Sequence, residues 1–189
     1  MYSFHPLLDN QQLLQHMLPE NGVTNGIVWH VRDGKKFYYI DSEHQRILLF
    51  TYSPRARTAT SNLHIVFDLS LWTRIEGYRI YNGNAIIGRM TIDTKGRLWV
   101  PLLGGSHVIQ VNPRTKVVMQ TVKIPAIKVS ACAFGGMRMN ILYVSTLGYG
   151  TDELRPTGDQ GGQIFAVSNL PDTVKGHEAM PFVVPTGLL

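Results

Sequence analysis

Three stretches of the sequence share one pattern, and this repeat limits the possible folds more than any other feature. Each stretch has an apolar run, a polar turn with Gly or Asn, and then an aliphatic–aromatic run. The stretches are NGIVWHVRDGKKFYYIDS, RMTIDTKGRLWVPL and ACAFGGMRMNILYVST. Their matched triplets are Tyr38–Ile40, Leu98–Val100 and Leu142–Val144, and the last two lie 44 residues apart. A period of about 40–50 residues is typical of the four-stranded blades of a β-propeller.

Short β-type runs, rich in Val, Ile, Tyr, Phe and Trp, recur between turn signals along the whole chain. Residues 1–25 also parallel residues 107–131, which extends the repeat to the first residues. We therefore expect an all-β fold, a partial β-propeller with about three and a half four-stranded blades in one truncated domain, 1–189. The expected parts are a partial blade at 1–19, blades at 24–70, 88–125 and 129–185, and a loop with an insertion at 71–87. The alternative is a small open β-sandwich with coincidental repeats.

Composition excludes several classes of protein. The chain is 44% hydrophobic and 16% charged, which supplies one sizeable core, and no run approaches the ~18 apolar residues of a membrane helix. The first residues show no secretory signal, and the single cysteine, Cys132, cannot form an internal disulfide. We therefore expect a cytoplasmic protein without membrane contact. The net charge of +5 is scattered over turns, so we expect no nucleic-acid partner.

Four segments carry a resemblance to a known family. They are TNGIVWHVRDGKKFYYIDSEHQRILLFTY, MTIDTKGRLWVPLLGGSHVIQVNPRTKVVMQTVKIP, VSACAFGGMRMNILYVST and GGQIFAVSNL. Together, from about Met1 to Phe182, they resemble the second half of the regucalcin, gluconolactonase and luciferin-regenerating-enzyme family, most closely an arthropod member. The resemblance implies a six-bladed β-propeller with one divalent metal, Ca²⁺ or Zn²⁺, in its central channel. It also implies a small sugar lactone as substrate, polarised by the metal and attacked by water with the help of a carboxylate.

The family holds its metal with a Glu, an Asn and an Asp. By the resemblance, Asn25 in TNGIVW matches the Asn ligand, although alone it would indicate only an Asn-Gly turn. Gly88 stands where the metal-binding Asp is expected, so the catalytic residues are unknown, and Arg89 adds a positive charge beside it. The blade that carries the Glu is absent. A single amide oxygen holds a divalent cation poorly, and we expect weak or no metal binding and little lactonase activity.

The remaining candidates have ordinary structural interpretations. The stretch Arg79–Ile87 indicates an insertion with a hairpin turn at Asn82-Gly83. Asp93 matches a structural turn residue of the family, and no spacing marks the other carboxylates as a site. The histidines lack metal-ligand spacing, and both Cys132 and the two tryptophans of the repeats are expected in the core. The carboxylates concerned are Asp41, Glu43 and Asp152, the histidines are His30, His44, His64 and His107, and the tryptophans are Trp29 and Trp99. The glycine-rich stretches 103–106 and 159–163 are expected to form turns.

Three functions remain open at this stage. The chain could be a metal-dependent lactonase. It could be a non-catalytic calcium-binding or interaction module that associates with itself through open strand edges. It could also be a splice or duplicate product without independent activity.

Overall fold

The computed structural model describes residues 2–4, 14–16, 24–53, 55, 58–75, 80–81 and 83–178. Almost all regular structure in this part of the chain is antiparallel β-sheet, as the sequence predicts. The first large sheet has the order β3-β4-β5-β6, and its strands are β3 (Ile27–Trp29), β4 (Lys36–Asp41), β5 (Arg46–Ser53) and β6 (Thr58–Asp68). Strands β1 (Tyr2–Phe4) and β2 (Leu14–His16) pair with each other as a separate two-stranded sheet.

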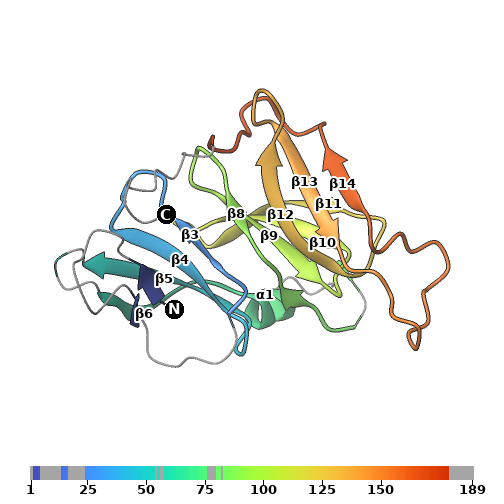
Figure 1. The fold of residues 1–189 in the computed structure, drawn as a ribbon, viewed down its shortest axis with the longest axis horizontal. Helices are drawn as coiled ribbons and strands as arrows, with labels where there is room; N and C mark the ends of the chain where they lie inside the picture. The colour runs from blue at the N-terminus through green and yellow to red at the C-terminus, as the bar shows by residue number, and fades with distance from the viewer. Residues whose placement is uncertain are drawn as a thin grey trace, which may run out of the picture.

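Two further sheets follow in chain order, and Figure 1 shows the three side by side. The second contains β7 (Ile86–Ile87), β8 (Thr91–Ile92), β9 (Leu98–Leu103), β10 (His107–Asn112) and β11 (Val117–Lys123). Both β7 and β8 pair with β9. Together they take the place of one strand at the edge of the sheet, next to β9, and β10 and β11 follow on the other side. The third contains β12 (Val129–Gly135), β13 (Ile141–Thr146) and β14 (Ile164–Val167).

The core around the middle sheet consists of two layers, one on each of its faces. A third cluster, which includes Phe37, Tyr39 and Phe50, lies on the other face of the first sheet. Strand β9 alternates its side chains between the two layers of the middle sheet. Leu98 and Val100 face a cluster that includes Tyr38 and Ile47 of the first sheet. Trp99 faces a cluster that includes Leu142 of the third sheet. Because both faces are covered, β9 is buried along almost its whole length. Stacked sheets with an apolar layer between each pair are the packing expected of propeller blades.

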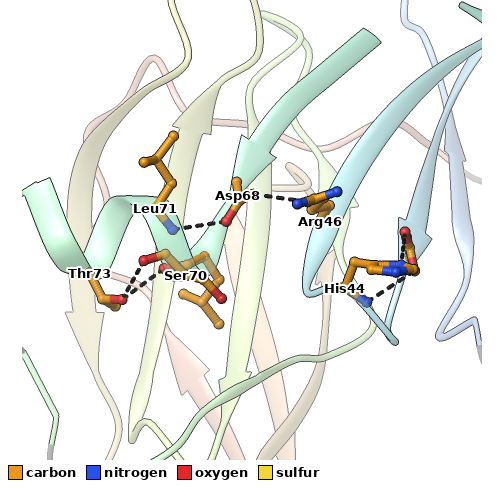
Figure 2. Close-up of polar contacts among 8 residues, drawn as sticks. His44, Arg46, Asp68, Ser70, Leu71 and Thr73 are labelled. Carbon is orange, nitrogen blue, oxygen red and sulfur yellow. Dashed lines mark hydrogen bonds and ion pairs between the residues drawn. The ribbon is translucent and has the colours of Figure 1, made fainter. Parts of the chain in front are cut away.

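The segment 71–87 differs from the expected loop. Helix α1 (Leu69–Ile75) starts directly after β6, where the Asp68 carboxylate accepts a hydrogen bond from the Leu71 backbone N–H at 2.8 Å (Figure 2). The end of the segment is β7, whose Ile87 is fully buried. The expected turn at Asn82-Gly83 lies partly outside the described residues, and Gly83 has a φ of +80°. The residues read as an insertion therefore supply part of the core.

The structure corrects the expected position of one tryptophan. Trp99 is completely buried, as predicted, but Trp29 is 44% exposed. It lies on β3, which pairs only with β4 among the described strands, and its ring meets Phe37 edge-on at a centroid distance of 5.2 Å. An edge strand leaves one flank of each side chain without a neighbour, which the amino-acid type does not reveal.

The third blade, expected over 129–185, has three strands in its described part. After β14 the chain continues to residue 178 without a strand. It lies against the turns of the two preceding sheets, where Thr94 N–H donates to Lys175 O and Gly176 N–H donates to Met139 O, both at 2.8 Å. Residues 179–185 lie outside the described residues. Among the described helices, none is long and apolar enough to cross a membrane.

Asp93 fixes the turn between β8 and β9. Its side chain is completely buried, and one carboxylate oxygen accepts the backbone N–H groups of Lys95 and Arg97 at 2.9 and 3.0 Å. The other accepts the indole N–H of Trp99 at 3.2 Å and the Gln110 amide at 3.1 Å. The Arg97 guanidinium lies 3.0 Å from the same oxygen. A buried carboxylate with this many partners holds the turn and the inner strands in register.

We predict that Asp93→Ala lowers the free energy of unfolding by about 3–5 kcal/mol, because it leaves Arg97 and several buried donors without their acceptor. Urea denaturation followed by circular dichroism measures the change. Asp33→Ala is the matched control: Asp33 occupies the corresponding turn of the first sheet, but its side chain is 36% exposed, and its loss should change stability much less. Equal effects of the two substitutions would contradict a special role for the buried network.

Candidate functional site

The inner strands β3, β7–β8 and β12 bring together the residues that the family resemblance assigns to the metal. Asn25 lies two residues before the start of β3, and its side-chain amide donates a hydrogen bond to the Ile87 carbonyl oxygen at 2.9 Å. A Cβ on Gly26, whose φ is +134°, would lie 3.6 Å from Arg89 Cγ. The structure therefore places Asn25 next to Ile87 and near Arg89, although they are more than 60 residues apart in the sequence.

Gly88 lies at the closest approach of the second and third sheets. Its N–H donates to the Pro101 carbonyl at 2.8 Å, and the following N–H, of Arg89, donates to the Ser130 carbonyl of β12 at 2.9 Å. A Cβ on Gly88 would overlap the Ser130 carbonyl oxygen and lie 3.1 Å from Pro101 Cγ. Because the obstruction is backbone, it cannot rotate away. The position expected to hold the metal-binding Asp has no room for a side chain.

Arg89 follows with an exposed side chain. Both backbone polar groups of Arg89 are hydrogen-bonded to β12, because its carbonyl also accepts the Cys132 N–H at 3.1 Å. Its guanidinium makes no hydrogen bond or ion pair with the part of the chain that the structure describes. A positively charged residue in the neighbourhood of Asn25 opposes the binding of a cation there.

The other carboxylates do not complete a metal site. The Asp41 side chain contacts the following turn, where its Oδ2 lies 2.9 Å from His44 Nδ1. Glu43 and Asp152 are exposed. Within residues 24–53 and 83–178 and the shorter described segments, no three His, Cys, Asp or Glu side chains gather closely enough to hold a metal ion. One amide without a carboxylate, with an arginine in the same neighbourhood, does not fit Ca²⁺ or Zn²⁺, which gain affinity from ligand charge and number.

The histidines and the cysteine occupy separate positions. His30 lies at the turn after β3, where partial burial lowers its pKa, and His64 is exposed on β6. His107 is buried at the start of β10, with its Nδ1 2.7 Å from the Gly105 carbonyl. Complete burial raises the pKa of the Cys132 thiol to about 12, and the thiol donates to the Trp99 carbonyl. A protonated, buried thiol is a structural group and a poor nucleophile.

The structure contains an apolar cavity of about 450 Å³ between α1, β6 and the start of β11, which no sequence motif indicates. Its lining comes from segments about 45 residues apart, so no local pattern could indicate it. The glycine-rich stretches form turns as expected, with Gly104 and Gly162 at φ values of +90° and +91°.

Comparison with known proteins identifies the ancestry of this arrangement. Residues 6–148 match the model of the SMP-30/Gluconolactonase/LRE-like region. Regucalcin from Gallus gallus is 32% identical over 186 residues, which is 95% of this chain and 55% of that protein. The putative sugar lactone lactonase YvrE from Bacillus subtilis is 32% identical over 123 residues, 65% of this chain and 38% of that protein.

Solved structures show the same fold. A luciferin-regenerating enzyme superposes with a TM-score of 0.70 and 28% identity, covering 87% of this chain and 50% of that one. The calcium-binding protein regucalcin of Agrobacterium tumefaciens superposes with a TM-score of 0.61 and 18% identity, covering 82% and 48%. These neighbours are six-bladed propellers, and the expected partial propeller is confirmed. The chain spans about half the length of the relatives it matches, and it belongs to the SMP-30/gluconolactonase/LRE-like family.

Proposed function

We propose that this chain is a non-hydrolytic member of the lactonase-like family, in which the metal position has been converted into a backbone contact between blades. The regucalcin and lactonase relatives make a sugar lactone and a divalent ion the expected ligands of the ancestral site. The proposal rests on one observation: a side chain at Gly88 would overlap the Ser130 carbonyl. Of the two implied ligand positions that fall within this sequence, only Asn25 then has a side chain, and its amide N–H₂ donates to the Ile87 carbonyl.

We predict that Gly88→Ala lowers the free energy of unfolding by about 3 kcal/mol, at the upper end of overpacking costs, because the new methyl group meets backbone. Gly34→Ala is the matched control, since nothing lies within 4 Å of a Cβ at Gly34. It should change stability by less than about 0.5 kcal/mol. Denaturant unfolding of both variants measures the difference. If Gly88→Ala is as stable as the parent, position 88 has room for the family's carboxylate and the proposal loses its support.

The second test is direct. We expect isothermal calorimetry with CaCl₂ or ZnCl₂ to show no saturable binding up to about millimolar concentrations, the weak end of protein calcium sites. We also expect hydrolysis of a sugar lactone, with either metal supplied, at the uncatalysed rate. Saturable binding and metal-dependent hydrolysis that are both lost in Asn25→Ala would overturn the proposal and restore the lactonase hypothesis.

One observation favours self-association as a second role. The outer face of the third sheet carries Ile164, 73% exposed, and Tyr143, 39% exposed, and cross-strand pairing places them on the same face. Ala133 and Ala166 on this face are also exposed. Between the other sheets the equivalent faces are buried. A second copy could cover this face and the edge of β14, which pairs only with β13 among the described strands.

We predict that the chain sediments as a dimer or larger species at micromolar concentration and that Ile164→Lys shifts it to monomer, because the substitution places a charge on the apolar face. Sedimentation velocity over a range of concentrations measures this. Leu154→Lys is the control, since Leu154 is 95% exposed in the loop before β14 and lies off the sheet. A native chain that is monomeric at every concentration would exclude this role.

A further inference from the structure

A small cleft lies at the end of the sheets opposite to Asn25, because Asn25 precedes β3 whereas the cleft begins at the turn that follows it. In the described chain, the turns between β3 and β4, between β8 and β9, and between β10 and β11 meet there. Their polar side chains, with one from β4, line the cleft: His30, Arg32, Tyr38, Lys95, Asn112 and Arg114. The cleft measures about 30 Å³, which is room for about two water molecules or the head of one small ion.

The turns that form the cleft are held against each other. Gly96 has a φ of +80°, and its N–H donates to the Asp93 carbonyl at 2.8 Å, which closes the turn that the buried Asp93 side chain also holds. A Cβ on Gly96 would lie 3.3 Å from Val31 Cγ2, so the turns of the first and second sheets are in close contact. The cleft therefore exists before any ligand binds.

The described lining includes positive charges that have no partner. Arg32, Lys95 and Arg114 are exposed, and their side chains make no ion pair or hydrogen bond with the part of the chain that the structure describes. The neighbouring carboxylate is paired elsewhere, because Asp33 Oδ2 lies 3.1 Å from Lys36 Nζ. None of the described lining residues is itself a carboxylate. The local field therefore favours an anion.

Two uncharged donors complete the lining. Tyr38 is only 3% exposed, and its hydroxyl makes no hydrogen bond with the described residues but is not sealed from solvent. Polar groups of buried residues are nearly always paired, so this hydroxyl marks a place where an acceptor atom fits. His30 Nδ1 accepts the Arg32 backbone N–H at 3.2 Å, so the neutral ring carries its proton on Nε2 and can donate it.

These groups lie close enough together to interact electrostatically. The ring centroids of His30 and Tyr38 are 6.0 Å apart. Partial burial lowers the pKa of His30; Asp33 opposes this, and nearby cations that include Arg114 and Arg32 add to it. Burial raises the pKa of Tyr38, and the charge of Arg114 opposes that rise. Arg114, from the second sheet, therefore acts on both aromatic side chains from the first sheet.

We propose that this cleft binds the phosphate head of a small soluble phosphate monoester. The charges of Arg32, Lys95 and Arg114 attract the head, and the Tyr38 hydroxyl and the His30 Nε2–H donate to its oxygens. A phosphate group matches this lining better than a carboxylate does, because it carries close to two negative charges and three strong acceptor oxygens. The cleft has room for the head alone, so the rest of the molecule stays outside. The site uses none of the residues around Asn25 and Gly88, and it is independent of the proposed loss of lactonase activity.

Glycerol 3-phosphate is the probe, and isothermal calorimetry at constant ionic strength is the measurement. We expect saturable binding at one site per chain, and no saturable binding of acetate or of glycerol. No saturable binding of glycerol 3-phosphate, or equal binding of acetate, would overturn the proposal. Cosedimentation with phosphatidylcholine vesicles that contain phosphatidic acid tests a lipid source of the same head. Capture by these vesicles without binding of glycerol 3-phosphate would also overturn it.

Tyr38→Phe removes only the hydroxyl. We expect it to weaken the binding of glycerol 3-phosphate about tenfold, as for a hydrogen bond to a charged group. The midpoint of urea unfolding should not fall, because the hydroxyl has no partner in the described protein. Tyr39→Phe is the matched control: the next side chain along β4 lies on the other face, in the cluster with Phe50, and its change should leave binding as it was. Equal losses in the two variants would contradict the proposed role of the hydroxyl.

A second pair of variants tests the charge. Arg114→Gln should weaken binding about threefold to fivefold, as expected for an exposed ion pair. Arg138→Gln lies in the exposed turn between β12 and β13, outside the lining, and should leave binding unchanged. If both variants weaken binding equally, the anion responds to the net charge of the chain and not to this cleft, and the proposal is wrong.

Discussion

The backbone contact between β7–β8 and β12 is the constraint on which the rest of the structure depends. Gly88 lets the two inner strands approach until Arg89 exchanges backbone hydrogen bonds with Ser130 and Cys132. Arg89 and Ala131 consequently form a parallel bridge between the second and third sheets. The same approach leaves no space for a side chain at the position where the family carries a carboxylate. Under the proposed function, the packing of the sheets and the loss of the metal position have the same cause.

Acidic side chains in the described part of the chain serve mainly to hold turns and strand ends. Asp93 fixes a turn from inside the core, and Asp68 caps α1 while pairing with Arg46. Asp159 accepts the Ile127 and Gly161 N–H groups at 2.6 and 2.8 Å, which ties the loop before β14 to the start of β12. The hydrogen bond from Lys128 lowers the pKa of Glu153. Oxygen atoms occupied in this way are not free to gather around a cation.

Much of the fold follows from local patterns, and particular residues show where those patterns stop. Aliphatic–aromatic runs at 37–40 and 98–100 indicate strands, and the structure places them in the interior strands β4 and β9 of their sheets. The run 69–75 does not stand out as a helix in the sequence, because its apolar residues also continue the preceding strand pattern. Nothing local marks Ile87 as a core residue, because its core neighbours lie in other segments of the chain. Residue type predicts Trp29 in the core, but it lies on an edge strand where one flank has no neighbour.

By itself, the sequence determined the repeat, the strand-and-turn pattern and the family, because all three depend on residue types at fixed spacing. It also placed glycine at position 88 and a positive charge at position 89. Only the tertiary structure decided that Gly88 has no room for another side chain, because the obstructing Ser130 carbonyl comes from a different blade. The cavity between α1 and β11 likewise exists only in the tertiary structure, because its lining comes from two distant segments of the chain. Distances between segments far apart in the chain are set by how the sheets stack, and no local pattern encodes them.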